Sequence, residues 1–334
     1  MKITSIQGLR AIAAWLVVFH HVLQIYYEST YTSLLGWLAL AKGSVGVDLF
    51  FVISGFVMII VTSSGTTSAG SFLMRRLARI VPAYWLATGI FAGVLLVFPH
   101  LVRHPIRLDL QHLGMSLGFL SGYFPGHFYP VLTVGWSLNF EMLFYFLLAL
   151  AIASGRALAV SHLERWLVPL AIACLVFVYP WSFPGTEMLK SRLLLVFVMG
   201  HALGLLYVRQ RLPLKPWLGP LLIGAGIATI LTFERKATIV WGAACTAIVW
   251  GSLCLERYFA RMKWLSTLGN WSYSTYLVHP IVIFLAFELR LAIGKTWDPW
   301  LVALSLVVIL AISRLSFRYV ELPGQRVFLG KLAG

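Results

Sequence analysis

Charged residues are scarce in this 334-residue chain, and acidic residues are the scarcest of them. Only 11% of the residues are charged and only 11 are Asp or Glu, whereas about a quarter of the residues of a soluble domain carry a charge. Hydrophobic residues make up 60% of the chain, and the mean hydropathy is +0.87. This balance excludes an ordinary water-soluble domain and predicts that lipid surrounds most of the chain.

Cysteine is also rare, with three residues at Cys174, Cys245 and Cys254. Their number is odd, all three lie in apolar runs, and they have no metal-ligand spacing, which excludes a disulfide framework and a cysteine metal site. We interpret them as packing residues and expect no metal. The N-terminal apolar run contains Arg10 and no small-residue cleavage site, so a cleaved signal peptide is not expected.

Basic residues outnumber acidic ones and give a formal net charge of +15. They are not clustered on one soluble face, so nucleic acid is not an expected partner. They lie between apolar segments instead, as the positive-inside rule describes. With the N-terminus inside, the inner connections carry 15 Lys and Arg residues and the outer ones carry 9. We therefore predict that both termini are cytoplasmic.

Apolar segments long enough to approach the roughly 20 residues of a spanning helix recur along the whole chain. They predict an all-α, polytopic membrane bundle that forms one domain over residues 1–334, without an internal repeat or a soluble domain. The segment 108–123 is weakly apolar and is predicted to be interfacial or re-entrant. The ten predicted spans are 8–26, 44–62, 80–98, 131–153, 166–180, 192–208, 217–233, 238–254, 266–289 and 299–317.

Ionisable side chains inside spans cost about 2.5–3.5 kcal/mol each at mid-helix and usually serve a function. The first span carries Arg10 and His21 in GLRAIAAWLVVFHH. Eleven residues make three helical turns plus about 20°, so the two side chains share one face and are about 16 Å apart along the axis. Arg10 then lies near the inner surface and His21 near mid-depth, whereas His20 points about 100° away. A hydrogen-bonded structural histidine is the alternative interpretation of His21.

Asp48 opens the second span in GVDLFFVISGF. It could orient the imidazole of His21 and stabilise its charged form, as the carboxylate of a catalytic triad does. An ordinary Asp in the first turn of a helix is an equally simple explanation.

Three arginines, Arg75, Arg76 and Arg79, lie within five residues in FLMRRLARIVPAYW, before the third predicted span. Guanidinium groups bind phosphates well, so the cluster could be an anion site. Ordinary positive charge at the inner end of a span explains it too.

Polar residues recur in two later spans. Glu141 in VGWSLNFEMLFYF is predicted near mid-bilayer, with Trp136 above it and Tyr145 one turn below it. No Lys or Arg near it on that helix neutralises it, which favours a functional role. In LGNWSYSTYLVHPIV, Tyr276 and His279 form a polar stripe on one face. A proline kink with a hydrogen-bonded histidine is the alternative there.

Taken in order, these motifs resemble the acyltransferase-3 family of membrane proteins over nearly the whole chain. Within that family they most resemble the exopolysaccharide O-acetyltransferases of the succinoglycan type. The resemblance is carried by SIQGLRAIAA with the R-x10-H spacing of Arg10 and His21, GVDLFFVISGF, RRLARIVPAYW, VGWSLNFEMLFY, LGNWSYSTYLVHP and FRYVELP.

The resemblance implies a multi-pass enzyme of the bacterial cytoplasmic membrane that is surrounded by membrane lipid. It implies transfer of an acyl group, usually acetyl, from cytosolic acyl-coenzyme A to a polysaccharide or lipid-linked saccharide, with acyl-CoA as co-substrate and no permanently bound cofactor. His21 takes the role of the essential histidine and Arg10 that of its partner. Arg76 and Arg79, with Arg75 beside them, are expected to contact the coenzyme, and Glu141 matches the acid of the W-S-L-x-x-E motif.

The residues themselves leave the mechanism open. His21 could deprotonate the acceptor hydroxyl or carry the acyl group itself, with Asp48, Glu141 or both tuning it. We expect Trp136, Tyr145, Tyr276 and His279 to contact substrate. The main alternative function is a saccharide transporter or flippase without acyl chemistry. Transporters are often built from paired repeats with broken helices, which the sequence does not show.

Overall fold

The structure is a computed structural model, and every regular element that it describes is helical. It describes residues 3–26, 36, 38, 41–99, 108–124, 129–178, 187–294 and 298–330. The α-helices are α1 (Thr4–Tyr26), α3 (Val45–Thr62), α4 (Ala69–Val97), α5 (Leu110–Leu117), α6 (Trp136–Ala157), α7 (Glu164–Ala173), α8 (Leu193–Val208), α9 (Leu218–Thr232), α10 (Thr238–Cys254), α11 (Glu256–Phe259), α12 (Lys263–Ile293), α13 (Asp298–Ser316) and α14 (Leu322–Gly330).

Short segments of other helical types join some of these elements. A 3₁₀ turn at Thr133–Gly135 precedes α6, and π-helical turns at Cys174–Val178 and Phe317–Glu321 follow α7 and α13. Within the described residues, six helical segments are long and apolar enough to cross a membrane, and α8, α9 and α10 are shorter apolar helices. The predicted all-helical membrane bundle is therefore confirmed, while the count of ten spans and the cytoplasmic location of the termini stay predictions.

The element boundaries differ most from the sequence prediction at α4. That helix begins at Ala69, where the Ser68 side chain accepts a hydrogen bond from the Ser71 N–H at 3.2 Å. The sequence predicts that this span starts at residue 80, which is wrong. Hydropathy falls across the arginine-rich stretch before residue 80, but the helix itself continues through that stretch. Pro82 consequently lies well inside the helix. Residues 108–123, predicted not to span, contain only the eight-residue helix α5.

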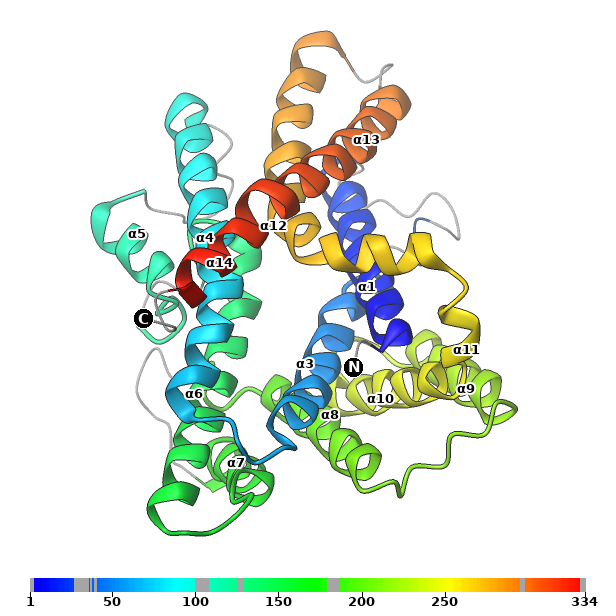
Figure 1. The fold of residues 1–334 in the computed structure, drawn as a ribbon. Coiled ribbons are helices and arrows are strands. Elements are labelled where there is room, and N and C mark those ends of the chain that lie inside the picture. The colour runs from blue at the N-terminus through cyan, green and yellow to red at the C-terminus, as the bar shows by residue number, and fades with distance from the viewer. Residues whose placement is uncertain are drawn as a thin grey trace.

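The helices pack as two groups that meet at α1 and α3 (Figure 1). Helix α1 lies along α12, and α13 packs on α12 and leads into α14, which crosses α4. On the other side, α3 packs on α8, and α10 packs on α9, α8 and α3. Helices α4 and α6 contact each other. The inward faces of α1, α3, α4, α6 and α12 therefore surround a common interior.

Small residues allow the closest of these contacts. A β-carbon at Gly200 of α8 would collide with the carbonyl oxygen of Val52 in α3, and one at Gly269 of α12 would collide with the carbonyl oxygen of Gln7 in α1. Helices in lipid associate through such close backbone approach because the hydrophobic effect does not drive them together.

The N-terminus of α1 is anchored by a carboxylate from α11. The Glu256 side chain accepts hydrogen bonds from the Thr4 hydroxyl at 2.6 Å and from the Ser5 N–H at 2.9 Å. Burial raises the pKa of Glu256, but these hydrogen bonds outweigh it and hold the pKa below its usual value. A negative charge at a helix N-terminus is favourable, so this contact fixes the position of α1.

Replacing Gly200 with alanine is expected to lower the melting temperature of the protein in detergent. The added methyl group forces α3 and α8 apart, and overpacking of this kind costs about 1–3 kcal/mol. Gly224→Ala in α9 is the matched control, because nothing lies within 4 Å of the added carbon there. Equal melting temperatures for the two variants would contradict the close packing of α3 on α8.

Candidate functional site

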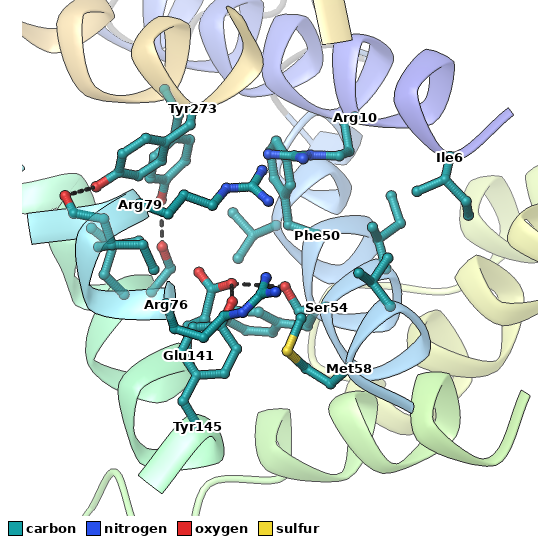
Figure 2. Close-up of a pocket in the computed structure, with 18 of the residues that line it drawn as sticks. Ile6, Arg10, Phe50, Ser54, Met58, Arg76, Arg79, Glu141, Tyr145 and Tyr273 are labelled. Atoms are coloured by element: carbon teal, nitrogen blue, oxygen red, sulfur yellow. Dashed lines mark hydrogen bonds between the residues drawn. The ribbon is translucent and has the colours of Figure 1, made fainter. Parts of the chain in front are cut away.

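Five helices enclose a cavity of about 130 Å³ whose lining is rich in charged and polar groups. Helix α1 contributes Arg10, α4 contributes Arg76 and Arg79, and α6 contributes Glu141 and Tyr145. Figure 2 shows these side chains converging on one space between α1, α3, α4, α6 and α12. We name this space the arginine cavity. The arginine motif of α4, the first-span arginine and the mid-span glutamate, far apart in sequence, are thus brought together.

The position of the arginines follows from the early start of α4. Arg76 and Arg79 are three residues apart within the helix and so share one face, which is turned to the cavity. Arg75 points elsewhere, is exposed, and donates to the Ser71 hydroxyl at 3.1 Å. The expected coenzyme contacts at Arg76 and Arg79 therefore face the cavity, whereas Arg75 lies outside its lining.

Glu141 is the carboxylate at the centre of the arginine cavity. Its Oε1 accepts hydrogen bonds from the Ser54 hydroxyl at 2.8 Å and from the Tyr145 hydroxyl (Figure 2). Arg10 and Arg76 both lie within electrostatic range of Glu141. A carboxylate near several guanidinium groups lowers their mutual repulsion. Three cations against one anion in the lining leave the cavity positively charged.

A second carboxylate, Glu321, supports the same arginines from outside the lining. It is 3% exposed and accepts a hydrogen bond from the Ser274 hydroxyl. Arg10 and Arg79 lie within its electrostatic range. Sequence reasoning missed Glu321 because it placed the end of the last span at residue 317. The usable signal was a lone acid in FRYVELP, where the structure has a π-helical turn, a feature frequent at functional sites.

The two histidines of the motifs form a pair beside the arginine cavity rather than in its lining. His279 Nε2 lies 3.2 Å from His21 Nδ1, and the ring centroids are 5.1 Å apart. His21 Nδ1 lies 3.0 Å from the Val17 carbonyl oxygen, and His279 Nδ1 lies 3.1 Å from the Thr275 carbonyl oxygen. His279 is fully buried and His21 is half-buried. The sequence predicts that His279 contacts substrate, which stays a prediction, and the structure places its ring against His21.

Tyr276 lies between the arginine cavity and the histidine pair. It lines the cavity, and its ring centroid is 5.8 Å from that of His279. Its hydroxyl donates to the Val134 carbonyl at 2.9 Å and lies 2.8 Å from the Ser137 hydroxyl. These contacts hold the ring in place, and a group moving from the cavity to the histidines would pass it.

Asp48 has a partner other than His21. Its Oδ2 forms a salt bridge with Arg235 Nη2 at 3.2 Å, and the Asp48 side chain is 0% exposed. Arg235 lies between α9 and α10 and also stacks over the Trp241 ring, with its central carbon 5.1 Å from the ring centroid. The proposed pairing of Asp48 with His21 is therefore replaced by an ion pair that joins α3 to the α9–α10 connection.

Trp136 is also outside the arginine cavity. At the start of α6 it packs edge-on against Phe51 and Phe140, with ring centroids 6.5 and 5.9 Å away. Of the four residues predicted to contact substrate, Tyr145 and Tyr276 line the cavity, while Trp136 is packed among aromatic rings.

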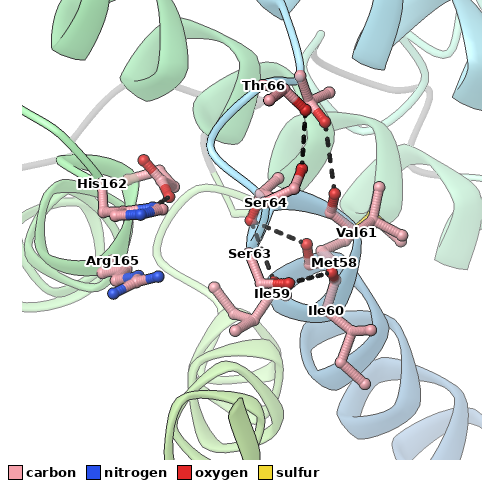
Figure 3. Close-up of polar contacts among 12 residues, drawn as sticks. Met58, Ile59, Ile60, Val61, Ser63, Ser64, Thr66, His162 and Arg165 are labelled. Carbon is pink, nitrogen blue, oxygen red and sulfur yellow. Dashed lines mark hydrogen bonds and ion pairs between the residues drawn. The ribbon is translucent and has the colours of Figure 1, made fainter. Parts of the chain in front are cut away.

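A second cavity of about 270 Å³ lies beyond the arginine cavity along α3 and α6. Met58 lines the arginine cavity, and Thr62, one turn further along α3, lines the second. Its other walls include Arg156, which donates to the Thr66 carbonyl at 3.1 Å, and His162, which lies 3.3 Å from a Glu164 oxygen. Figure 3 shows the hydroxyl groups that follow α3 and, across from them, His162 and Arg165. By the predicted orientation this cavity faces the cytoplasm.

Comparison with known proteins gives a family match over nearly the whole chain. A family model described as an acyltransferase domain matches residues 3–315. The exopolysaccharide production protein ExoZ of Rhizobium meliloti (strain 1021) is 35% identical over 272 residues, which cover 75% of this chain and 80% of that protein. Acyltransferase MdmB of Streptomyces mycarofaciens is 28% identical over 323 residues, 85% of this chain and 79% of that protein. No solved structure matches significantly.

A match over part of the chain supports the same class of protein, the membrane acyltransferases. The putative membrane-bound transacylase BcsY of Komagataeibacter xylinus is 33% identical over 167 residues, which cover 46% of this chain and 38% of that protein.

Removing either side chain of the Asp48–Arg235 pair is expected to destabilise the protein unequally. Arg235→Gln leaves a fully buried carboxylate without its cation and should cost about 3–5 kcal/mol. Asp48→Asn should cost less, because the Arg235 side chain is 33% exposed and water can solvate it. The double variant should be no less stable than Arg235→Gln alone, as measured by thermal unfolding in detergent. Lost acyl transfer with unchanged unfolding in Asp48→Asn would restore a catalytic role for Asp48.

Proposed function

Because this chain belongs to the acyltransferase-3 family and is a membrane acyltransferase, we propose that it transfers an acetyl group from cytosolic acetyl-coenzyme A to a saccharide hydroxyl. The acceptor is an extracytoplasmic or lipid-linked polysaccharide. The observation that carries the proposal is the arginine cavity, which lies next to a histidine pair inside the membrane domain.

The charge of the arginine cavity suits an anionic donor. The lining of the cavity contains three arginines, Arg10, Arg76 and Arg79, and one carboxylate, Glu141. Coenzyme A carries phosphates, which guanidinium groups bind through charge-assisted hydrogen bonds. The second cavity lies next along α3 and α6 on the side predicted to face the cytoplasm. The donor enters from that side and extends its thioester toward Tyr276.

His21 supplies the reactive nitrogen. As a general base it takes the proton of the acceptor hydroxyl, and the hydroxyl oxygen then attacks the thioester carbon. As an acyl carrier it attacks that carbon first and passes the acetyl group to the hydroxyl in a second step. In both routes the carbon–sulfur bond breaks and the thiolate leaves with the electron pair. In the base route, the proton on His21 can then pass to that thiolate.

The acceptor approaches from the outer side. The ExoZ relative is described as an exopolysaccharide production protein, and His21 lies about 16 Å further along α1 than Arg10. The reacting hydroxyl therefore meets the thioester at His21, with the donor phosphates held at the arginines. Tyr276, which contacts His279 and lines the cavity, guides the thioester between the two places.

The decisive experiment incubates purified protein in lipid nanodiscs with radiolabelled acetyl-CoA and bacterial exopolysaccharide. Label on the saccharide is expected for the wild type, with at least a 100-fold lower rate for His21→Ala, since a positioned base contributes about 10²–10⁴-fold. His20→Phe is the matched control and should retain most activity, because phenylalanine keeps a ring where the His20 ring packs edge-on against His21, with centroids 5.2 Å apart.

Two outcomes would overturn this proposal. Full activity of His21→Ala would remove the histidine mechanism. Movement of the saccharide across proteoliposomes without any acetyl transfer would favour the transporter alternative.

Replacing Arg76 or Arg79 with alanine is expected to raise the KM for acetyl-CoA about tenfold or more, since a charged hydrogen bond contributes about 1.5–3 kcal/mol. The KM for the saccharide should change little. Arg75→Ala is the control on the same helix, because Arg75 is exposed and outside the cavity lining. Initial rates over a range of both substrates measure the effect. Equal KM increases for both substrates, or for all three arginine variants, would contradict the assignment.

A further inference from the structure

The contact between His21 and His279 determines which ring nitrogen of His21 carries a proton. A carbonyl oxygen can only accept a hydrogen bond, so a ring nitrogen that faces one must carry the hydrogen. His279 Nδ1 faces the Thr275 carbonyl at 3.1 Å and is therefore the N–H of that ring.

His279 then has a lone pair on its other nitrogen. The ring is fully buried, and no carboxylate in the described residues forms a hydrogen bond with it. A buried imidazole in such surroundings is neutral, because an unpaired buried charge is very costly. A neutral imidazole carries one hydrogen, so His279 Nε2 is an acceptor.

The same elimination applies to His21. Its Nδ1 faces two acceptors, the Val17 carbonyl oxygen at 3.0 Å and His279 Nε2 at 3.2 Å. Nδ1 must carry the hydrogen, which leaves the lone pair on Nε2. General-base action and acyl transfer both need a lone pair on a nitrogen such as Nε2, which forms no hydrogen bond with the part of the chain that the structure describes.

We propose that His279 is a positioning residue that holds His21 in the Nδ1–H form, with Nε2 free to react, and accepts the Nδ1–H bond when His21 becomes cationic. This is the place that a carboxylate occupies in a catalytic triad. The inference rests on the proposed function only in taking His21 as the reactive group. The carboxylates predicted to tune His21 are engaged elsewhere, Asp48 with Arg235 and Glu141 with Ser54 and Tyr145.

When His21 takes the hydroxyl proton at Nε2, its ring becomes an imidazolium with hydrogens on both nitrogens. The Nδ1–H bond to His279 Nε2 strengthens, because a charged donor makes a stronger hydrogen bond. The proton at Nε2 then passes to the departing thiolate, and His21 returns to the Nδ1–H form. No proton is left over, and His279 stays neutral throughout.

The test is nitrogen NMR on protein labelled with ¹⁵N-histidine in nanodiscs, with the His21 signals assigned by their loss in His21→Asn. The chemical shifts distinguish a protonated from an unprotonated ring nitrogen and do not require activity. Wild type should show His21 protonated at Nδ1 and bare at Nε2. In His279→Phe, which keeps a ring of similar size, only the Val17 carbonyl remains as an acceptor at Nδ1. The Nδ1–H signal should therefore shift and the Nε2–H form should gain population, with kcat lowered about 10- to 100-fold and KM for acetyl-CoA unchanged.

His279→Gln provides the rescue, because its amide oxygen can accept from His21 Nδ1–H and should restore the tautomer and most of kcat. His201→Phe is the matched control, since His201 is another fully buried histidine bonded to a carbonyl, that of Arg165 at 3.1 Å. It should leave the His21 signals and kcat unchanged.

A wild-type His21 protonated at Nε2, or His279→Phe with unchanged shifts and kcat, would overturn the inference. The expected shifts in a protein that transfers no acetyl group would overturn the proposed function instead.

Discussion

The arrangement of the helices depends on keeping three arginines inside a membrane domain. Arg10, Arg76 and Arg79 converge on one cavity, and isolated charges at such depth are costly. Glu141 and Glu321 offset part of that cost, because the charge of Arg10 interacts with both carboxylates. The helices that carry these groups must therefore meet, and the capping of α1 by Glu256 and the close approach of α1 to α12 at Gly269 keep them in register.

The sequence predicted much of this because charges within apolar segments are visible without a structure. The helical class, most helix positions and the placement of Arg10 and Glu141 inside the bundle follow from hydropathy and from the cost of burying charge. The extent of α4 was not predictable, since a window of hydropathy drops where arginines occur even if the helix continues. Glu321 was missed for a related reason: a π-helical turn carries the last helix past its apolar segment.

The sequence alone does not show which residues of different helices contact each other. Asp48 could have met any cation or imidazole at the same depth, and its partner, Arg235, lies outside the predicted spans. Likewise, nothing in LGNWSYSTYLVHP shows that His279 faces His21, because that depends on how α1 and α12 rotate against each other. Sequence periodicity fixes which residues share a face of one helix, but only packing decides which faces meet.

The separation of the arginine cavity from the histidine pair has an electrostatic reason. Binding phosphates requires positive charge, whereas a base that must take up a proton is hindered by positive charge close to it. One compact site cannot satisfy both needs. The fold places the guanidinium groups near the start of α1 and His21 about three turns further along, with the neutral ring of Tyr276 between them. A neutral imidazole, His279, then suits His21 better than a carboxylate would, because a carboxylate there would be an unpaired charge until the moment of reaction.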